Sequence, residues 1–160
     1  MSQFVVTQRF MSLATNYDVT APGSEDVLLT IKGTLMSPTP LFSLVEGTNG
    51  KELATLRGNF AKTQFHVLGA DGKELATVDF PAIALKKKLA LKIGDREYTA
   101  DGGVFSGVFQ CKDAGGNIAI EISKVRSVRD KFSVVTKDDI GQEVGLLAAV
   151  AIHSRFFEMV

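Results

Sequence analysis

Three consecutive lysines, Lys86, Lys87 and Lys88, form the longest run of like charges in the sequence, and Lys92 and Arg96 follow shortly after them. Basic side chains near the start of a strand can attract a phosphoinositide headgroup or an anionic membrane surface, at about 1 kcal/mol for each residue. Lysines also protect exposed strands from pairing with another chain, which is a purely structural role. The run therefore predicts a lipid contact made by these five residues, with edge protection as the alternative.

Side chains that support catalysis are few. Two histidines and one cysteine are too few for a convincing zinc site. His66 alternates with apolar neighbours in an expected strand and His153 lies in an apolar segment, so we interpret both as structural histidines. Cys111 falls on an apolar strand face, where an inert buried thiol is expected. We therefore predict no catalytic residue and no cofactor.

Two further stretches contain residue types that could form a site. GGVFSG contains Ser106, but its spacing is neither that of a nucleophile elbow nor that of a dinucleotide fingerprint, and no helix follows it. Asp138, Asp139 and Glu143 lie just before the apolar C-terminal segment. Calcium takes about six to eight oxygen ligands at defined spacing, so we expect Asp139 to cap a helix there instead. No metal site is predicted.

Composition limits the class of protein. Eighteen basic and eighteen acidic residues give a formal net charge of zero, which removes the broad attraction that nucleic-acid binders use. A length of 160 residues corresponds to one domain, predicted over residues 1–160. A single cysteine cannot form an internal disulfide, and the N-terminal residues lack the pattern of a secretory signal. We expect a cytoplasmic protein that does not bind nucleic acid.

The elements that must position these residues are mostly strands. Turn signals rich in Gly, Asn and Asp separate short segments whose apolar residues alternate with period two. This spacing favours an antiparallel sandwich or a closed barrel. The pattern predicts about twelve strands, near 4–9, 16–20, 27–35, 41–46, 52–57, 64–68, 74–80, 89–93, 96–100, 104–111, 117–124 and 131–136.

One stretch occurs twice, as NGKELATL and DGKELATV, with Lys51 and Lys73 at matching positions 22 residues apart. In each copy a turn is followed by a strand and a returning partner. GSEDVLLTIKGTLMS and AGGNIAIEISKVRS have the same form more weakly. Internal duplication and convergent hairpin chemistry both explain the repeat, and both predict the same local structure.

The C-terminal segment breaks this pattern. From Leu146 to Ile152 every residue is apolar, which predicts a helix, near 139–158, that is buried on all sides. A membrane span is the alternative, but polar residues from His153 onward interrupt the run well short of the roughly 20 apolar residues that a span needs. Together with some twelve strands, the segment predicts a barrel with the helix in its centre.

These features resemble the LURP-one-related family, which groups with the phospholipid scramblases and the Tubby C-terminal domains. The matching stretches are VVTQRFMSL, the two turn-and-strand units NGKELATL and DGKELATV, AGGNIAIEISKVRSVRDKFSVV and LLAAVAIHSRFFE. The resemblance implies a mainly β fold in which a twelve-stranded antiparallel closed barrel encloses a hydrophobic C-terminal helix.

What the resemblance implies about function is broader. Relatives are associated with lipid movement and calcium, with phosphoinositide binding, or with plant defence, and fold alone does not choose among them. The leading hypothesis is a non-enzymatic binding module that contacts anionic phospholipid and is peripheral at a membrane. A protein-interaction or structural barrel without lipid affinity is the alternative, and an enzyme that uses the rim of the barrel is a third.

Overall fold

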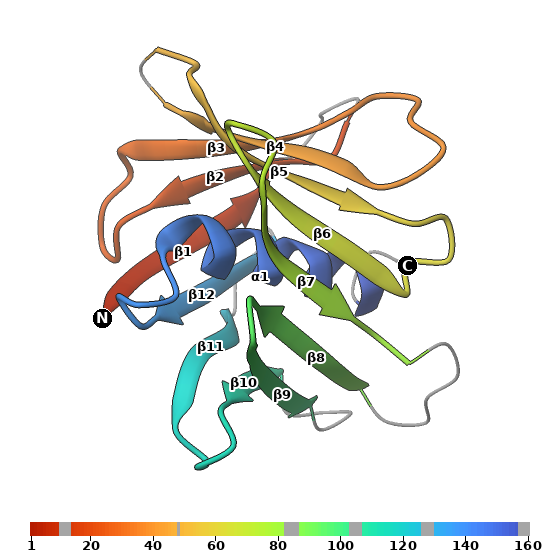
Figure 1. Cartoon of the computed structure of the whole chain (residues 1–160). Helices are drawn as coiled ribbons and strands as arrows, with labels where there is room; N and C mark the ends of the chain where they lie inside the picture. The colour runs from red at the N-terminus through yellow and green to blue at the C-terminus, as the bar shows by residue number, and fades with distance from the viewer. Residues whose placement is uncertain (10–13, 48, 82–86, 103–106, 126–129, 157–160) are drawn as a thin grey trace.

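The computed structural model describes residues 1–9, 14–47, 49–81, 87–102, 107–125 and 130–156. Within this part of the chain lie twelve strands and one helix (Figure 1). The elements are β1 (Ser2–Gln8), β2 (Asn16–Thr20), β3 (Val27–Gly33), β4 (Leu41–Glu46), β5 (Glu52–Gly58), β6 (Gln64–Gly69), β7 (Glu74–Asp79), β8 (Lys87–Ile93), β9 (Arg96–Gly102), β10 (Val108–Lys112), β11 (Ile118–Val125), β12 (Lys131–Thr136) and α1 (Gln142–Phe156).

The strands form a closed barrel in which each strand pairs with its neighbours in sequence. All pairs are antiparallel, and β1 closes the barrel by pairing with both β2 and β12. Along each strand the apolar residues of one parity face inward and are buried, as alternation requires. The predicted mainly β, twelve-stranded antiparallel barrel is therefore confirmed.

Helix α1 runs through the interior of the barrel (Figure 1). Every residue from Val144 to Ser154 is buried, because strands surround the helix on all sides. Gly145 permits the closest approach, since a Cβ at this position would lie 2.9 Å from the Cβ of Thr136 on β12. Within the described residues, no helix is both long enough and apolar enough to cross a membrane.

The expected N-cap of the helix is wrong. The helix begins at Gln142, and Gly141, with a φ of 88°, separates it from the turn that contains Asp139. Asp139 instead forms an ion pair with Arg96, with 3.2 Å between its Oδ2 and the guanidinium Nη1. The left-handed backbone at Gly141 thus turns the chain into the barrel after the acidic residues, and Glu143 supplies the negative charge of the first helical turn.

The barrel has two ends that we name by their connections. At the turn end, short connections join β2 to β3, β4 to β5, β6 to β7, β8 to β9 and β10 to β11, and α1 begins there. At the loop end lie the connections β1–β2, β3–β4, β5–β6, β7–β8, β9–β10 and β11–β12. The helix ends at the loop end, where Lys62 of the β5–β6 connection donates a hydrogen bond to the carbonyl oxygen of Ser154 at 3.1 Å.

The two copies of the repeated stretch make the same side-chain contact at the end of their turns. In the first copy the Asn49 side-chain oxygen accepts a hydrogen bond from the amide of Lys51 at 2.9 Å. In the second, Asp71 accepts from the amide of Lys73 at 3.0 Å. Each turn contains a glycine with positive φ, Gly50 or Gly72. The two stretches therefore end their turns in the same way, with an Asn or Asp side chain in place of a backbone acceptor, but the first turn is one residue longer, since Gly50 donates to Glu46 and Gly72 donates to Gly69.

Each copy also carries a β-bulge one residue after its glutamate, where β5 and β7 have one residue more than the strands opposite. Residues at i and i+3 of a regular strand face opposite sides, but the extra residue brings glutamate and threonine to the same side. Thr55 accordingly donates to Glu52 at 2.8 Å, and Thr77 donates to Glu74. The weaker echoes share the plan, since β3 and β11 bulge at the corresponding position after their turns.

Candidate functional site

The predicted basic residues do not gather in one place. Lys86 lies outside the described residues, and only the backbone of Lys87 is described. Lys87 and Lys88 start β8 at the loop end, and the side chain of Lys88 is exposed. Lys92 lies four residues further along the strand, about 13 Å away at 3.3 Å per residue, and Arg96 begins β9 at the turn end. The structure thus separates the lysine run at the loop end from Arg96 at the turn end, with Lys92 between them.

Lys92 and Arg96 each face a carboxylate. The ammonium of Lys92 lies 3.8 Å from Asp79 Oδ2 on the neighbouring β7, and Arg96 contacts Asp139 as described above. Both pairs are at least partly exposed, so solvent screens them and their stabilisation is small. Their charges are nevertheless matched locally, which weakens the predicted grouping of Lys92 and Arg96 with the lysine run.

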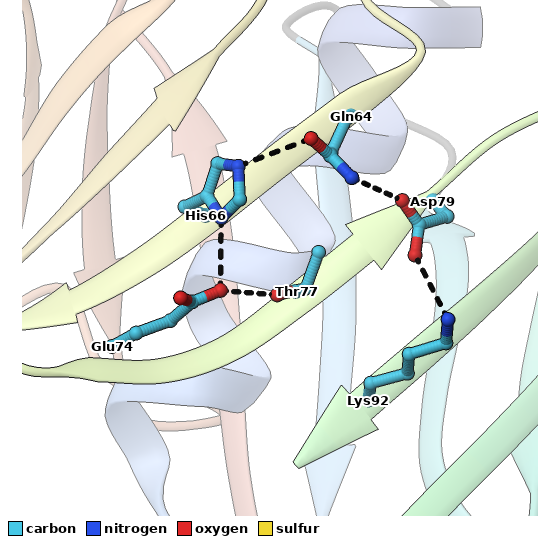
Figure 2. Close-up of polar contacts among 6 residues, drawn as sticks. All are labelled: Gln64, His66, Glu74, Thr77, Asp79 and Lys92. Atoms are coloured by element: carbon cyan, nitrogen blue, oxygen red, sulfur yellow. Dashed lines mark hydrogen bonds and ion pairs between the residues drawn. The ribbon is translucent and has the colours of Figure 1, made fainter. Parts of the chain in front are cut away.

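Lys92 belongs to a polar network on the outer wall of the barrel, drawn in Figure 2. Gln64 on β6 donates from Nε2 to Asp79 Oδ1 at 2.9 Å, which turns its Oε1 towards His66 Nε2 at 3.2 Å. His66 Nδ1 lies 2.9 Å from Glu74 Oε1 on β7. Since both ring nitrogens face acceptors, the network is complete when the ring carries two N–H groups.

Glu74 is the other centre of this network. The hydrogen bond from Thr77, followed by that from His66, holds the pKa of the Glu74 carboxyl below its usual value. His66 therefore contacts neighbouring side chains on the outer surface of β6, while Phe65 and Val67 point into the core. This arrangement fixes side chains of three adjacent strands to one another, and the alternation pattern contained no sign of it.

His153 is buried near the end of the helix. Its Nδ1 lies 2.8 Å from the hydroxyl of Tyr17 on β2, and its ring stacks on Phe132 with centroids 5.5 Å apart. Asp130 Oδ2 lies 3.5 Å from His153 Nε2. A cavity of about 20 Å³ beside His153 and Phe132 has room for a single water molecule. The contacts join the helix to β2 and to the start of β12, which fits a structural histidine.

The remaining predicted positions divide between the core and the part of the chain that is not described. Cys111 is fully buried, and burial raises the pKa of its thiol to about 12, so the reactive thiolate is not formed at neutral pH. Ser106 lies outside the described residues. Within the described part of the chain, no group of three His, Cys, Asp or Glu side chains is placed to hold a metal ion.

The loop end contains a hollow of about 340 Å³ that the sequence did not indicate. It lies between the β3–β4 connection, the β5–β6 connection and the end of α1. Its polar lining comes from Thr15, Thr34, Ser37, Thr39, Lys62 and Ser154. The Ser154 hydroxyl is buried and has no hydrogen-bond partner among the described residues. Hydroxyls and an ammonium in one recess can bind the polar headgroup of an acidic ligand.

Large apolar side chains border this hollow. Phe60 lines it from the β5–β6 connection, and Met36 lies on the β3–β4 connection between the lining residues Thr34 and Ser37. One signal in the sequence could have found them, namely the presence of Met and Phe within turn-rich segments, where polar residues are usual. Alternation did not detect them because neither residue belongs to a strand.

Comparison with known proteins supports the resemblance drawn from sequence. The model of the LURP-one-related family matches residues 2–153, which include all twelve strands and the helix as far as His153. Comparison with curated proteins gives no match. Because the family match spans nearly the whole barrel and its central helix, the chain belongs to the LURP-one-related family.

Proposed function

We propose that this protein is a non-enzymatic binding module that contacts anionic phospholipid through the lysine run at the loop end. The proposal rests on the position of the lysine run in the barrel. Lys87 and Lys88 start β8 where it leaves the β7–β8 connection, and Lys88 is exposed. Lys62 lies at the same end of the barrel, in the next connection along the rim. Several lysines at one end would favour an anionic surface.

Lys92 and Arg96 are not part of the proposed contact. Arg96 begins β9 at the turn end and pairs with Asp139, while the Lys92 ammonium pairs with Asp79, so a carboxylate already offsets each of these two charges. Of the five residues predicted from sequence, the proposal keeps Lys86, Lys87 and Lys88. A module of this kind would be cytoplasmic and peripheral at the membrane.

Co-sedimentation with vesicles tests the proposal. The purified protein would be mixed with neutral vesicles, with phosphatidylserine vesicles and with phosphoinositide-containing vesicles, at low and high salt and with and without Ca²⁺. We expect binding to the anionic vesicles that weakens as salt rises, because salt screens exposed charges. The phosphoinositide arm distinguishes a specific headgroup from general negative charge.

A matched pair of variants locates the contact. Replacing Lys86, Lys87 and Lys88 by glutamate should abolish binding to anionic vesicles. The control replaces three exposed lysines of the turn end by glutamate, at positions Lys51, Lys73 and Lys112, which changes the net charge equally. Equal loss in both variants would show that net charge alone matters. Absence of binding by the unmodified protein would favour the alternative, a protein-interaction or structural barrel.

A further inference from the structure

The largest exposed apolar side chains of the loop end lie on two connections beside one hollow. Met36 is 93% exposed and Phe60 is 84% exposed, and Leu35, next to Met36, is 55% exposed. Apart from the terminal Met1, the exposed apolar side chains of the turn end have smaller exposed fractions, with Leu28 at 48%, Val27 at 40% and Leu75 at 37%.

The two sets of exposed apolar residues have different origins. Leu28 and Leu75 are the extra residues of the bulges in β3 and β7, so the strand geometry explains why they point away from the core. Met36 and Phe60 belong to connections and pair with no strand. Nothing in the hairpin geometry requires an apolar side chain at either position.

The backbone supports the distinction. Within the described residues, the non-glycine residues with positive φ are Met36, at 60°, and Lys62, at 56°. This conformation is unfavourable for residues that carry a Cβ, and it tends to persist where function retains it. Both residues belong to the two connections that border the hollow.

Polar and charged groups line the hollow that these apolar side chains border. Lys62 lines it and donates to the carbonyl oxygen of Ser154, and hydroxyl groups of the β3–β4 connection line it as well. Exposed apolar side chains beside a cationic and hydroxyl-lined recess match the two layers of a membrane interface. The apolar side chains would enter the acyl boundary, and the recess would meet phosphate and glycerol groups.

We propose that the barrel docks on an anionic membrane by its loop end, with Met36 and Phe60 inserted below the headgroups and Lys62 at the level of the lipid phosphates. This inference rests on the proposed function and adds the orientation and the inserted residues. Insertion would contribute apolar burial that salt does not screen, in addition to the attraction of the lysine run. The turn end, where Arg96 pairs with Asp139, would face away from the membrane.

Fluorescence tests the orientation directly. The chain contains no tryptophan, so Phe60→Trp creates a single reporter at the loop end and Leu75→Trp a matched reporter at the turn end. Both positions are exposed, so both variants should fold. On phosphatidylserine vesicles containing brominated lipid, we expect a blue shift and quenching for Phe60→Trp and neither for Leu75→Trp. Vesicle binding without any change in the fluorescence of the Phe60→Trp variant would overturn the orientation while leaving the proposed function intact.

A second pair of variants measures the contribution of insertion. Replacing both Met36 and Phe60 by serine should weaken vesicle binding at least about tenfold, while the control, with Leu28 and Leu75 replaced by serine, should retain its affinity. Equal affinity in both variants would overturn the insertion. Failure of the unmodified protein to bind vesicles would overturn the proposed function and this inference together. A blue shift that grows with protein concentration in the absence of vesicles would overturn the inference too, by assigning the two connections to contact between copies of the chain.

Discussion

The two ends of the barrel are built in different ways. At the turn end one hairpin plan recurs: a tight turn is followed by a strand that bulges near its start, in β3, β5, β7 and β11. The positive-φ positions in the described connections of this end are glycines. At the loop end the described connections share no such plan, and Met36 and Lys62 adopt positive φ despite their side chains.

The two ends also differ in how well their residues suit the backbone and the core. The turn end uses residues that suit their backbone, and two of its exposed apolar strand residues, Leu28 and Leu75, are the extra residues of bulges. The loop end keeps unfavourable backbone, exposed apolar side chains and a buried Ser154 hydroxyl that has no hydrogen-bond partner among the described residues. Packing does not require these features, and they are the reason why we propose ligand contact at the loop end.

The largest expected effect falls on the helix that joins both ends. Ala149→Arg would place a charge where the side chain is 1% exposed and strands surround it, at a cost of several kcal/mol. We expect the domain to lose its cooperative thermal melt. Leu28→Arg, on the exposed bulge of β3, is the control and should melt normally. A cooperative melt of Ala149→Arg near that of the unmodified protein would contradict the central position of the helix.

A smaller effect is expected where the helix enters at the turn end. Gly145→Ala would bring a Cβ to 2.9 Å from both Cβ and Oγ1 of Thr136, and such overpacking costs roughly 1–3 kcal/mol. Chemical denaturation would measure the loss in the free energy of unfolding. Adding Thr136→Ala removes two of the three nearest atoms and should restore part of the stability. No recovery in the double variant would show that the clash is not the cause.

Two substitutions at positive-φ positions, one at each end of the barrel, should change the free energy of unfolding in opposite directions. Gly72→Ala at the turn end meets no atom within 4 Å but requires a left-handed alanine, and should lower the free energy of unfolding by about 1–2 kcal/mol. Met36→Gly at the loop end relieves the same strain. It should raise the free energy of unfolding by about 0.5–1 kcal/mol, after allowing for the greater freedom of glycine in the unfolded chain.

Denaturant melts of both variants would measure these changes, and vesicle binding would be measured alongside. We expect Met36→Gly to be more stable and to bind vesicles more weakly. A destabilised Met36→Gly would mean that the Met36 side chain stabilises the fold, and the contrast between the two ends would then fail at this position.

The smallest expected effect concerns the outer wall between the two ends. The lowered pKa of Glu74 means that its contacts stabilise the fold above the usual carboxyl pKa of 4.5 and that this contribution disappears as the pH falls through the lower folded value. Because the site is exposed, we expect less than about 1 kcal/mol. Glu74→Gln should therefore lower Tm at neutral pH and match the unmodified protein in acid.

Thermal melts of Glu74→Gln and of the unmodified protein, from neutral to acid pH, would measure the effect. Glu52→Gln is the control, since Glu52 accepts a hydrogen bond from Thr55 in the first copy of the repeat but contacts no histidine among the described residues. A Tm difference for Glu74→Gln that stayed constant with pH would contradict the role of its carboxylate.

Much of the fold could be predicted because it depends on local patterns. Alternation placed the strands to within a few residues, and the apolar run placed the central helix, which begins three residues later than the expected residue 139. The prediction of Asp139 as N-cap was wrong because Gly141 places a left-handed residue between the acids and the helix. Glycine adopts many backbone conformations, so its presence in the sequence did not predict this one. The repeat was informative because both copies specify the same side-chain contact at the turn and the same bulge after it.

The candidate site was less predictable because it depends on which end of the barrel each residue reaches. Lys88, Lys92 and Arg96 are close in sequence, yet a strand of seven residues carries Lys92 away from the loop end, and the return turn leaves Arg96 beside Asp139. His66 and Glu74 are eight residues apart and meet only because β6 and β7 pair in a register shifted by the bulge.

Local sequence alone specifies the repeated hairpin, the alternation that gives each strand a buried face, and a helix too apolar to be exposed to water. These follow from interactions between residues close along the chain. Only in the folded barrel do Phe60 and Lys62 line one hollow with Ser154, which comes from a segment about ninety residues away, and with residues of the connection that carries Met36. Closure of the barrel around the helix brings these segments together, and no pattern of neighbouring residues encodes that proximity.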